Sequence, residues 1–157
     1  MDKILVWDMD GTIANLYGVP FWCAMLDSKN PLPYSICSPM WDMAELAEVL
    51  TSLRSEGWKI EIVTWLSRSY ATDKAYQQEI RKRKKAWLKQ YNFPYDNFHG
   101  VRYGTKKSSV ITHKNAEVAI LFDDNAEVRE SWSIGETVDP TTTDIIDFLK
   151  NLLTNNS

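Results

Sequence analysis

The feature that most constrains the fold is a short apolar run, residues 4–7, that stops at two carboxylates. Asp8 and Asp10 are spaced i, i+2, and Gly11 and Thr12 follow them. An apolar run of strand length that ends at a turn signal predicts a buried strand. Asp and Gly also occur in ordinary turns. We nevertheless interpret this stretch as a strand that delivers both acids into an active site at its carboxyl end.

Two later runs repeat this pattern. Residues 59–63 form a strand-like run that ends at Thr64, and residues 118–122 form another that ends at Asp123 and Asp124. In an open parallel sheet, ligands bind beyond the carboxyl ends of the strands. If the three strands are neighbours, their polar ends converge on one site. Spacing alone does not establish that they are neighbours.

Helical patterns alternate with these strands. An amphipathic helix is expected over residues 42–56, with Gly57 as its stop, and others over 72–91, 126–131 and 142–153. Short strands are expected at 98–103 and 136–138. A helix joined to a strand through a glycine is the repeating unit of an α/β fold, and right-handed crossovers make its strands parallel.

Composition limits the class of protein. At 157 residues and 18.2 kDa the chain predicts a single domain. A net charge of -3 and a pI near 5.4 exclude a surface that is basic throughout, although local basic patches stay possible. Without a leader or an apolar run of about 20 residues, a cytoplasmic protein with no membrane contact is expected. Cys23 and Cys37 lack metal-ligand spacing and are expected to be reduced.

The ordered polar positions carry a family resemblance. The Asp-Met-Asp-Gly-Thr stretch at 8–12, then Thr64, a lysine at Lys107 or Lys106, and Asp123-Asp124 resemble the four motifs of the haloacid dehalogenase-like (HAD) superfamily of phosphohydrolases. The opening is more weakly similar to the 5'(3')-deoxyribonucleotidase-like branch. The resemblance spans residues 4–126. It implies a Rossmann-like three-layer sandwich with a mainly parallel sheet.

The segment at about residues 16–42 is where the resembling superfamily inserts a cap over its active site. It is rich in aromatic residues, and Pro31, Pro33 and Pro39 disfavour a long helix. Its size implies a small cap, which leaves the site open to larger substrates or requires a partner chain to close it. Alternatively, Phe21, Trp22 and Met25 complete the main core.

The carboxylates suit phosphoryl transfer. Asp8 fits the nucleophile, since an ionised carboxylate needs no deprotonation and forms an aspartyl-phosphate. Asp10 can protonate the leaving alcohol and later activate water. Four acids in one crevice would repel one another and the substrate, and Mg²⁺ would relieve this. The resemblance implies the ligands Asp8, the backbone carbonyl of Asp10, and Asp123, with Asp124 bound directly or through water.

The remaining site residues concern the phosphate and the leaving group. Thr64, the backbone N–H groups of Met9 and Trp65, and Lys107 (or Lys106) are expected to hold the phosphoryl oxygens. The rings of Trp65 and Tyr17 either stack on a base or pack in the core. Glu127 is either a further metal ligand or an acid that stabilises the start of a helix.

The helix expected at 72–91 is strongly basic. Its cations form either a solvated face or a groove that draws a nucleic-acid end toward the site. They are Lys74, Arg81, Lys82, Arg83, Lys84, Lys85 and Lys89.

Three functions are compatible with these patterns. The first is a Mg²⁺-dependent phosphomonoester hydrolase acting on a phosphorylated small molecule, with nucleotides as candidates. The second is a phosphatase for phosphorylated nucleic-acid ends, and the third is a non-catalytic HAD-fold binding module. Phosphomutase chemistry is less favoured because a small cap would not keep water out. The oligomeric state is not encoded in any of these patterns.

Overall fold

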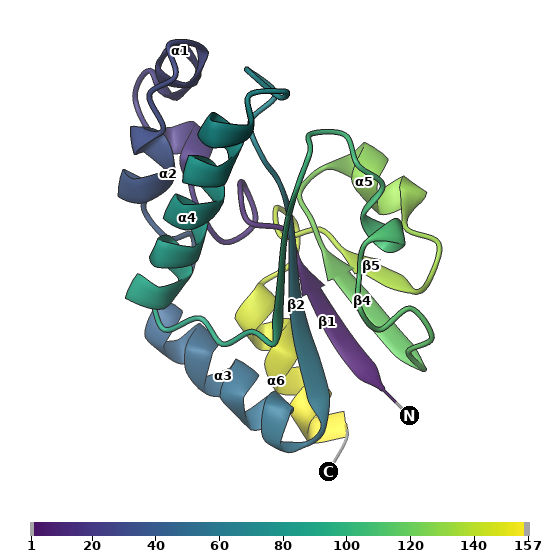
Figure 1. Cartoon of the computed structure of the whole chain (residues 1–157). Coiled ribbons are helices and arrows are strands. Elements are labelled where there is room, and N and C mark those ends of the chain that lie inside the picture. The colour runs from purple at the N-terminus through teal and green to yellow at the C-terminus, as the bar shows by residue number, and fades with distance from the viewer. Residues whose placement is uncertain (1, 156–157) are drawn as a thin grey trace.

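Parallel strands form one sheet whose central strand is the first in the chain. A computed structural model of the protein describes residues 2–155, and within this range the sheet order is β3-β2-β1-β4-β5 (Figure 1). Every neighbouring pair is parallel. The strands are β1 (Lys3–Trp7), β2 (Trp58–Trp65), β3 (Asn97–Val101), β4 (Val118–Phe122) and β5 (Glu136–Val138).

The described residues form six α-helices, and the last four lie close to their predicted positions. They are α1 (Trp22–Asp27), α2 (Leu32–Ile36), α3 (Met43–Ser55), α4 (Lys74–Gln90), α5 (Ala126–Ser131) and α6 (Ile145–Asn155), with 3-10 turns η1 (Leu16–Gly18) and η2 (Lys107–Ser109). Asp42 caps α3 by accepting a hydrogen bond from the Glu45 N–H. Gly57, at φ 98°, then turns the chain into β2. Within residues 2–155, no helix combines the length and apolar character that crossing a membrane demands.

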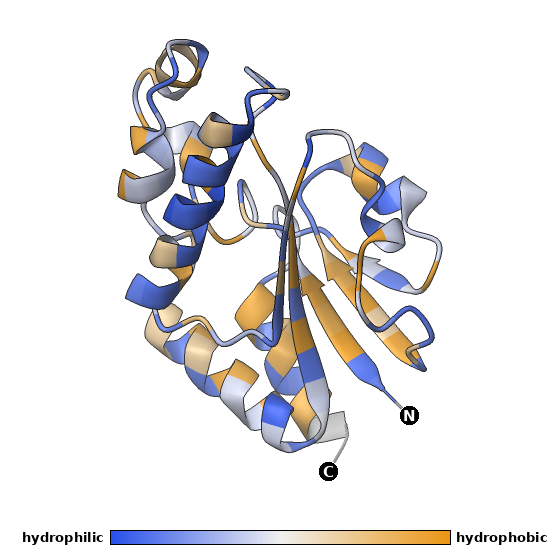
Figure 2. Ribbon diagram, in the orientation of Figure 1, coloured by the Kyte–Doolittle hydropathy of each residue, from blue (hydrophilic) through white to orange (hydrophobic). Residues whose placement is uncertain are grey.

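Strand alternation divides the core into two sides. Leu5 and Trp7 face the cluster formed by α3, α6 and the end of α4, whereas Ile4 and Val6 face the cluster around α5. The apolar strands therefore lie between two helical layers (Figure 2). The predicted α/β three-layer sandwich with a parallel sheet is confirmed.

The segment between β1 and α3 packs beside α4. Figure 1 shows α1 and α2 next to the first half of that helix. Leu16, Leu26 and Tyr34 form a separate buried cluster with Tyr76 and Ile80 of α4. Phe21 is 79% exposed, so the alternative in which this residue completes the main core is wrong.

A buried acid, Glu61, lies on the face of β2 opposite to that of Ile60 and Ile62. Glu61 is fully buried, and its carboxylate oxygens lie 2.8 Å from ring nitrogens of His99 and His113. The backbone N–H groups of Thr112 and His113 also donate to it. Burial opposes ionisation of Glu61, but these hydrogen bonds outweigh it and hold its pKa at about 2.

This cluster predicts a pH-dependent contribution to stability. A carboxyl pKa lowered from 4.5 to about 2 stabilises the fold above pH 4.5, and the contribution is lost as the pH falls toward 2. The full shift corresponds to about 3 kcal/mol. Urea unfolding of Glu61→Gln should therefore show a loss of this size at pH 7 and a much smaller loss near pH 2.5. The exposed Glu48→Gln serves as control, and an equal loss at both pH values would contradict the account.

Candidate active site

The three polar strand ends meet because β1 pairs with both β2 and β4. Trp7 is in register with Ile62 and with Phe122. Asp8 therefore follows the central strand, with Thr64 on one side and Asp123 on the other. The predicted convergence is confirmed.

A buried lysine joins two of these strand ends. The Nζ of Lys107 donates to Asp8 Oδ1 at 2.9 Å and to Asp123 Oδ2 at 2.7 Å. Burial disfavours its charge, but the two carboxylates outweigh this and raise the pKa of Lys107. Lys106 precedes η2 and is exposed. The structure therefore places Lys107, and not Lys106, in the site.

The Gly-Thr pair brings Asp124 against the first strand end. Thr12 Oγ1 donates to Asp8 Oδ2 at 2.9 Å and accepts from the backbone N–H of Asp124 at 3.2 Å. Gly11 has φ 81°, and a Cβ there would lie only 2.3 Å from Asp124 Oδ2. Any side chain at position 11 would therefore displace this carboxylate.

Three carboxylates form a group that can hold a cation. One oxygen from each of Asp8, Asp123 and Asp124 lies within 4.8 Å of the others. Burial and the nearby Asp8 carboxylate raise the pKa of Asp123 to about 6 and that of Asp124 to about 8. An all-oxygen donor set under mutual repulsion fits a hard divalent ion. Glu127 is exposed on α5 and is not part of this group.

Asp10 turns away from this group toward a second buried lysine. Lys84 of α4 is 1% exposed, and its Nζ donates to Asp10 Oδ2 at 2.7 Å and to Thr64 Oγ1 at 2.6 Å. It also donates to the carbonyl oxygen of Trp65 at 3.0 Å. Burial raises the pKa of Asp10, and the Lys84 ammonium acts in the opposite direction.

Sequence reasoning placed Lys84 among the surface cations of its helix and missed this role. A signal was available, because Tyr76, Ile80, Lys84 and Trp87 follow the helical spacing of a buried face. A charged residue at a core position of an amphipathic helix requires a partner. Here that partner is Asp10.

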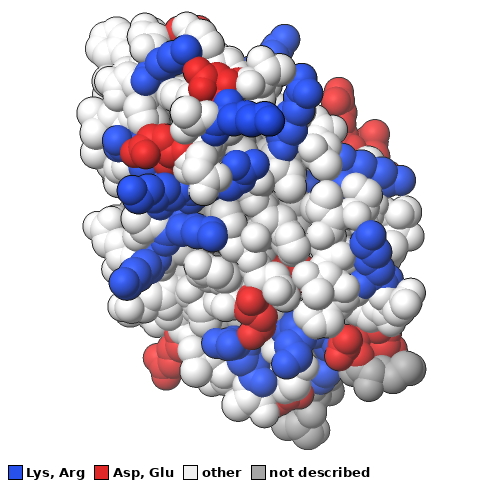
Figure 3. Space-filling view, in the orientation of Figure 1, with Lys and Arg blue, Asp and Glu red and all other residues white. Residues whose placement is uncertain are grey.

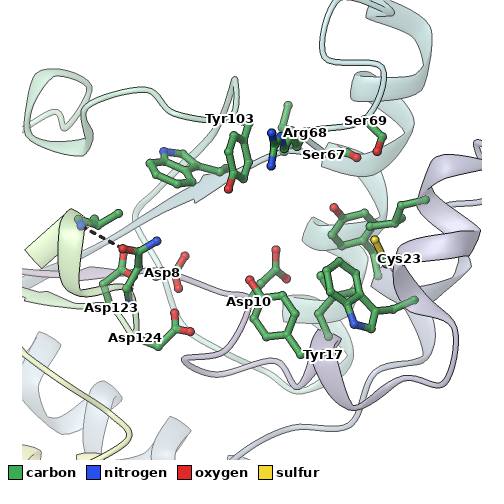
Figure 4. A pocket seen from close by; sticks show the side chains of 18 of the residues that line it. Asp8, Asp10, Tyr17, Cys23, Ser67, Arg68, Ser69, Tyr103, Asp123 and Asp124 are labelled. Carbon is green, nitrogen blue, oxygen red and sulfur yellow. Dashed lines mark hydrogen bonds between the residues drawn. The ribbon is translucent and has the colours of Figure 1, made fainter.

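The site opens into a pocket of about 630 Å³. In Figure 4, Asp8, Asp123 and Asp124 lie together at one end, and Tyr17 and Cys23 lie on the far side of Asp10. Arg68 and Tyr103 line the opposite wall. Aromatic and cationic groups thus surround the space next to the carboxylates.

The two aromatic residues singled out from the sequence both line this pocket. Tyr17 is 52% exposed, so the interpretation that it packs in the core is wrong. Trp65 is partly buried, with its Nε1 donating to the Thr105 carbonyl at 2.8 Å and its ring tilted against Tyr103. Lys107 Nζ lies 5.5 Å from the centre of the Trp65 ring.

Comparisons with known proteins identify the fold. No protein-family model matches the sequence, and no curated protein matches it. The HAD domain of effector protein Lem4 from Legionella pneumophila superposes with a TM-score of 0.57 at 16% identity, covering 99% of this chain and 96% of that one. A chain of the Pnkp1/Rnl/Hen1 complex superposes with a TM-score of 0.54 at 18% identity, covering 88% of this chain.

The protein chain has the HAD-like fold. Nearly full coverage of a HAD domain in both directions, together with the parallel sheet, supports this assignment. The chain spans less than half the length of the Pnkp1/Rnl/Hen1 chains it matches, 46% and 42%. The superfamily resemblance read from the ordered motifs is therefore confirmed at the level of the fold.

The Lys84–Asp10 pair generates a stability prediction. Removing one partner of a buried ion pair leaves an uncompensated charge, so Lys84→Met should cost about 3 kcal/mol in the free energy of unfolding. The double variant Lys84→Met/Asp10→Asn should lose less unfolding free energy than the two single variants lose in sum. Urea unfolding of the wild type, the two single variants and the double variant measures this coupling. The exposed Lys82→Met should stay within about 0.5 kcal/mol of wild type, and strictly additive losses would contradict the pairing.

Proposed function

We propose that the protein is a Mg²⁺-dependent phosphomonoester hydrolase that acts through an aspartyl-phosphate on Asp8. The observation that carries this proposal is the placement of Asp8 at the floor of the pocket. Its carboxylate is held by Lys107 and Thr12, and Asp10 stands two residues further along the chain. This arrangement supports a fixed nucleophile with an acid beside the leaving group.

Asp8 and Asp10 divide the chemistry. A carboxylate oxygen of Asp8 attacks phosphorus and forms the acyl-phosphate as the bond to the leaving oxygen breaks. Asp10 gives its proton to that oxygen, then takes one from the water that hydrolyses the intermediate. Burial, which raises the pKa of Asp10, favours the protonated form needed for the first step.

Asp8, Asp123, Asp124 and the backbone carbonyl of Asp10 would hold Mg²⁺. Bound there, the ion would neutralise the carboxylates and the phosphoryl oxygens. The donor set fits, because three carboxylates lie close enough to share one ion. The side chain of Asp10 is paired with Lys84, which leaves its backbone oxygen for this role.

Lys107, Thr64 and the backbone N–H of Trp65 would hold the phosphoryl oxygens. Lys107 carries positive charge beside Asp8. Thr64 Oγ1 accepts a hydrogen bond from Lys84, which leaves its hydroxyl hydrogen for another partner. The Trp65 carbonyl oxygen lies at a long distance of 3.4 Å from Thr64 Oγ1. We propose that this hydrogen is donated to the phosphate.

Nucleotides are the candidate small-molecule substrates. The pocket walls carry the rings of Tyr17, Trp22, Trp65 and Tyr103, which offer stacking surfaces for a base. The similarity to the 5'(3')-deoxyribonucleotidase-like branch remains a prediction. We also propose that residues 16–42 act as a small cap within a single domain, since Leu16, Trp22 and Tyr34 close one side of the pocket.

Phosphorylated nucleic-acid ends are the second candidate substrate. Cations of α4 and of the neighbouring loops favour a polyanion near this pocket. One protein of similar fold belongs to a complex described as the Pnkp1/Rnl/Hen1 RNA repair complex. That description concerns the other protein, and its likeness to this chain is one of fold.

Phosphate release tests the proposal directly. Wild-type protein with Mg²⁺ should hydrolyse an aryl phosphate, nucleoside monophosphates or phosphorylated oligonucleotides, and chelation should stop this reversibly. Asp8→Asn should lower turnover at least 10³-fold, because an amide is not a nucleophile here. The exposed Asp147→Asn, purified in the same way, controls for contaminating phosphatases.

Two outcomes would overturn the proposal. Full activity of Asp8→Asn would exclude the covalent mechanism. A folded wild-type protein that binds Mg²⁺ and releases no phosphate from any member of the panel would favour the non-catalytic binding module.

Metal binding generates a separate prediction that does not depend on turnover. An ion that binds only the folded state at 100 times its Kd stabilises it by about 2.7 kcal/mol. Mg²⁺ should therefore raise the Tm of the wild-type protein. Asp123→Asn should remove most of that rise, whereas Glu127→Gln should keep it, because only Asp123 belongs to the carboxylate group. An equal Mg²⁺-dependent rise in both variants would contradict the assigned ligands.

A further inference from the structure

A stripe of cations runs along the exposed side of α4. Lys74, Arg81, Lys85 and Lys89 are separated by seven, four and four residues, which places them on one face of the helix. This face lies beside β3, since Arg81 Nε donates to the Gly100 carbonyl at 2.8 Å and Lys85 Nζ lies 5.2 Å from the centre of the Phe98 ring. In Figure 3, Lys and Arg side chains gather over α4 although the chain as a whole is acidic.

Two hollows flank the middle of this stripe. The upper hollow, of about 530 Å³, is lined by Lys74, Arg81 and Arg102. The lower one, of about 480 Å³, is lined by Lys85, Lys89 and Tyr95 among others. Among the described residues, no Asp or Glu lines either hollow. We call the two hollows and the stripe between them the α4 groove.

The close packing of α4 on β3 depends on a glycine. A Cβ at Gly100 would lie 2.9 Å from Arg81 Cγ. The absence of a side chain there lets Arg81 lie across the edge strand and reach its backbone. Arg81 and Lys85 thereby form a cationic bridge between the upper and the lower hollow.

The upper hollow of the α4 groove adjoins the active-site pocket. Leu66 lines both that pocket and the upper hollow. The loop beyond Leu66 carries Arg68 into the pocket wall, and Gln77 of α4 holds this loop by donating to the Tyr70 carbonyl at 2.9 Å. A chain-like ligand that lies along α4 and this loop would pass cations at Lys89, Arg81 and Arg68.

We propose that the α4 groove binds a single strand of nucleic acid whose terminal phosphate enters the pocket. This inference rests on the proposed function and specifies its substrate. The stripe spans about 22 Å at 1.5 Å per residue, which matches about six nucleotides at the 3.4 Å rise of a strand with stacked bases. Attraction between the cations of the stripe and the phosphates of the strand supplies the affinity. The partly buried ring of Tyr95, which lines the lower hollow, offers a surface on which an unpaired base stacks.

Binding of a fluorescent 12-nucleotide single strand with a 5' or 3' phosphate to Asp8→Asn protein tests the groove without turnover. Adding Lys74→Gln/Lys85→Gln should weaken binding about tenfold and lower the slope of log Kd against log salt by about 1.4, or 0.7 for each lost phosphate contact. The control pair Lys59→Gln/Lys114→Gln makes the same charge change at exposed positions outside both hollows. It should bind as the parent does.

Stacking separates a nucleic acid from other polyanions. Tyr95→Ala should weaken oligonucleotide binding at least fivefold and leave binding of dextran sulfate unchanged. Equal weakening by the two lysine pairs, or insensitivity of the oligonucleotide to Tyr95→Ala, would overturn the proposal. Circular dichroism of each variant confirms folding.

Turnover distinguishes failure of this inference from failure of the proposed function. The ratio of kcat/KM for the phosphorylated oligonucleotide to that for an aryl phosphate should fall about tenfold in Lys74→Gln/Lys85→Gln. An unchanged ratio in an active enzyme would overturn the groove alone. Oligonucleotide binding through the groove without Mg²⁺-dependent release of phosphate would overturn the hydrolase alone.

Discussion

The site depends on the ion pairs that Lys107 makes with Asp8 and Asp123. These two carboxylates follow adjacent parallel strands, and a sheet that ends both strands in acids brings like charges together. The buried Lys107 ammonium between them offsets the repulsion and holds η2 against the carboxyl ends of β1 and β4. Asp8 therefore owes its position to a residue 99 positions later in the chain, and the loop that carries Lys107 is part of the framework of the candidate site.

Lys84 pairs with Asp10 in the same way as Lys107 pairs with Asp8. Asp8 and Asp10 are two residues apart, yet Lys107 holds one and Lys84 holds the other. Lys84 also donates to the hydroxyl oxygen of Thr64 and so joins the end of β2 to Asp10. The two acids thus occupy separate electrostatic environments, as the proposed roles of nucleophile and proton donor require.

The fold and most of the candidate site could be predicted because their signals are local. Apolar runs that stop at Asp8, Thr64 and Asp123 define strand ends, and a parallel sheet brings such ends together. The roles of Lys84 and of Glu61 with its histidines could not be predicted from the same signals. Lys84 meets Asp10 across 74 residues, and Glu61 meets His113 across 52, so each contact exists only after the chain folds. The exposed position of Tyr17 likewise depends on how the inserted segment packs.

The two faces of α4 have consequences for how the sequence can vary. Its buried face carries Lys84 into the site and its exposed face carries the cation stripe, so both sets of contacts share one helical register. One residue inserted between Asp73 and Lys84 would rotate everything beyond it by about 100° and carry Lys84 out of the core. In proteins descended from this one, insertions and deletions should therefore be confined to the connections on either side of α4. The number of residues within α4 should stay constant.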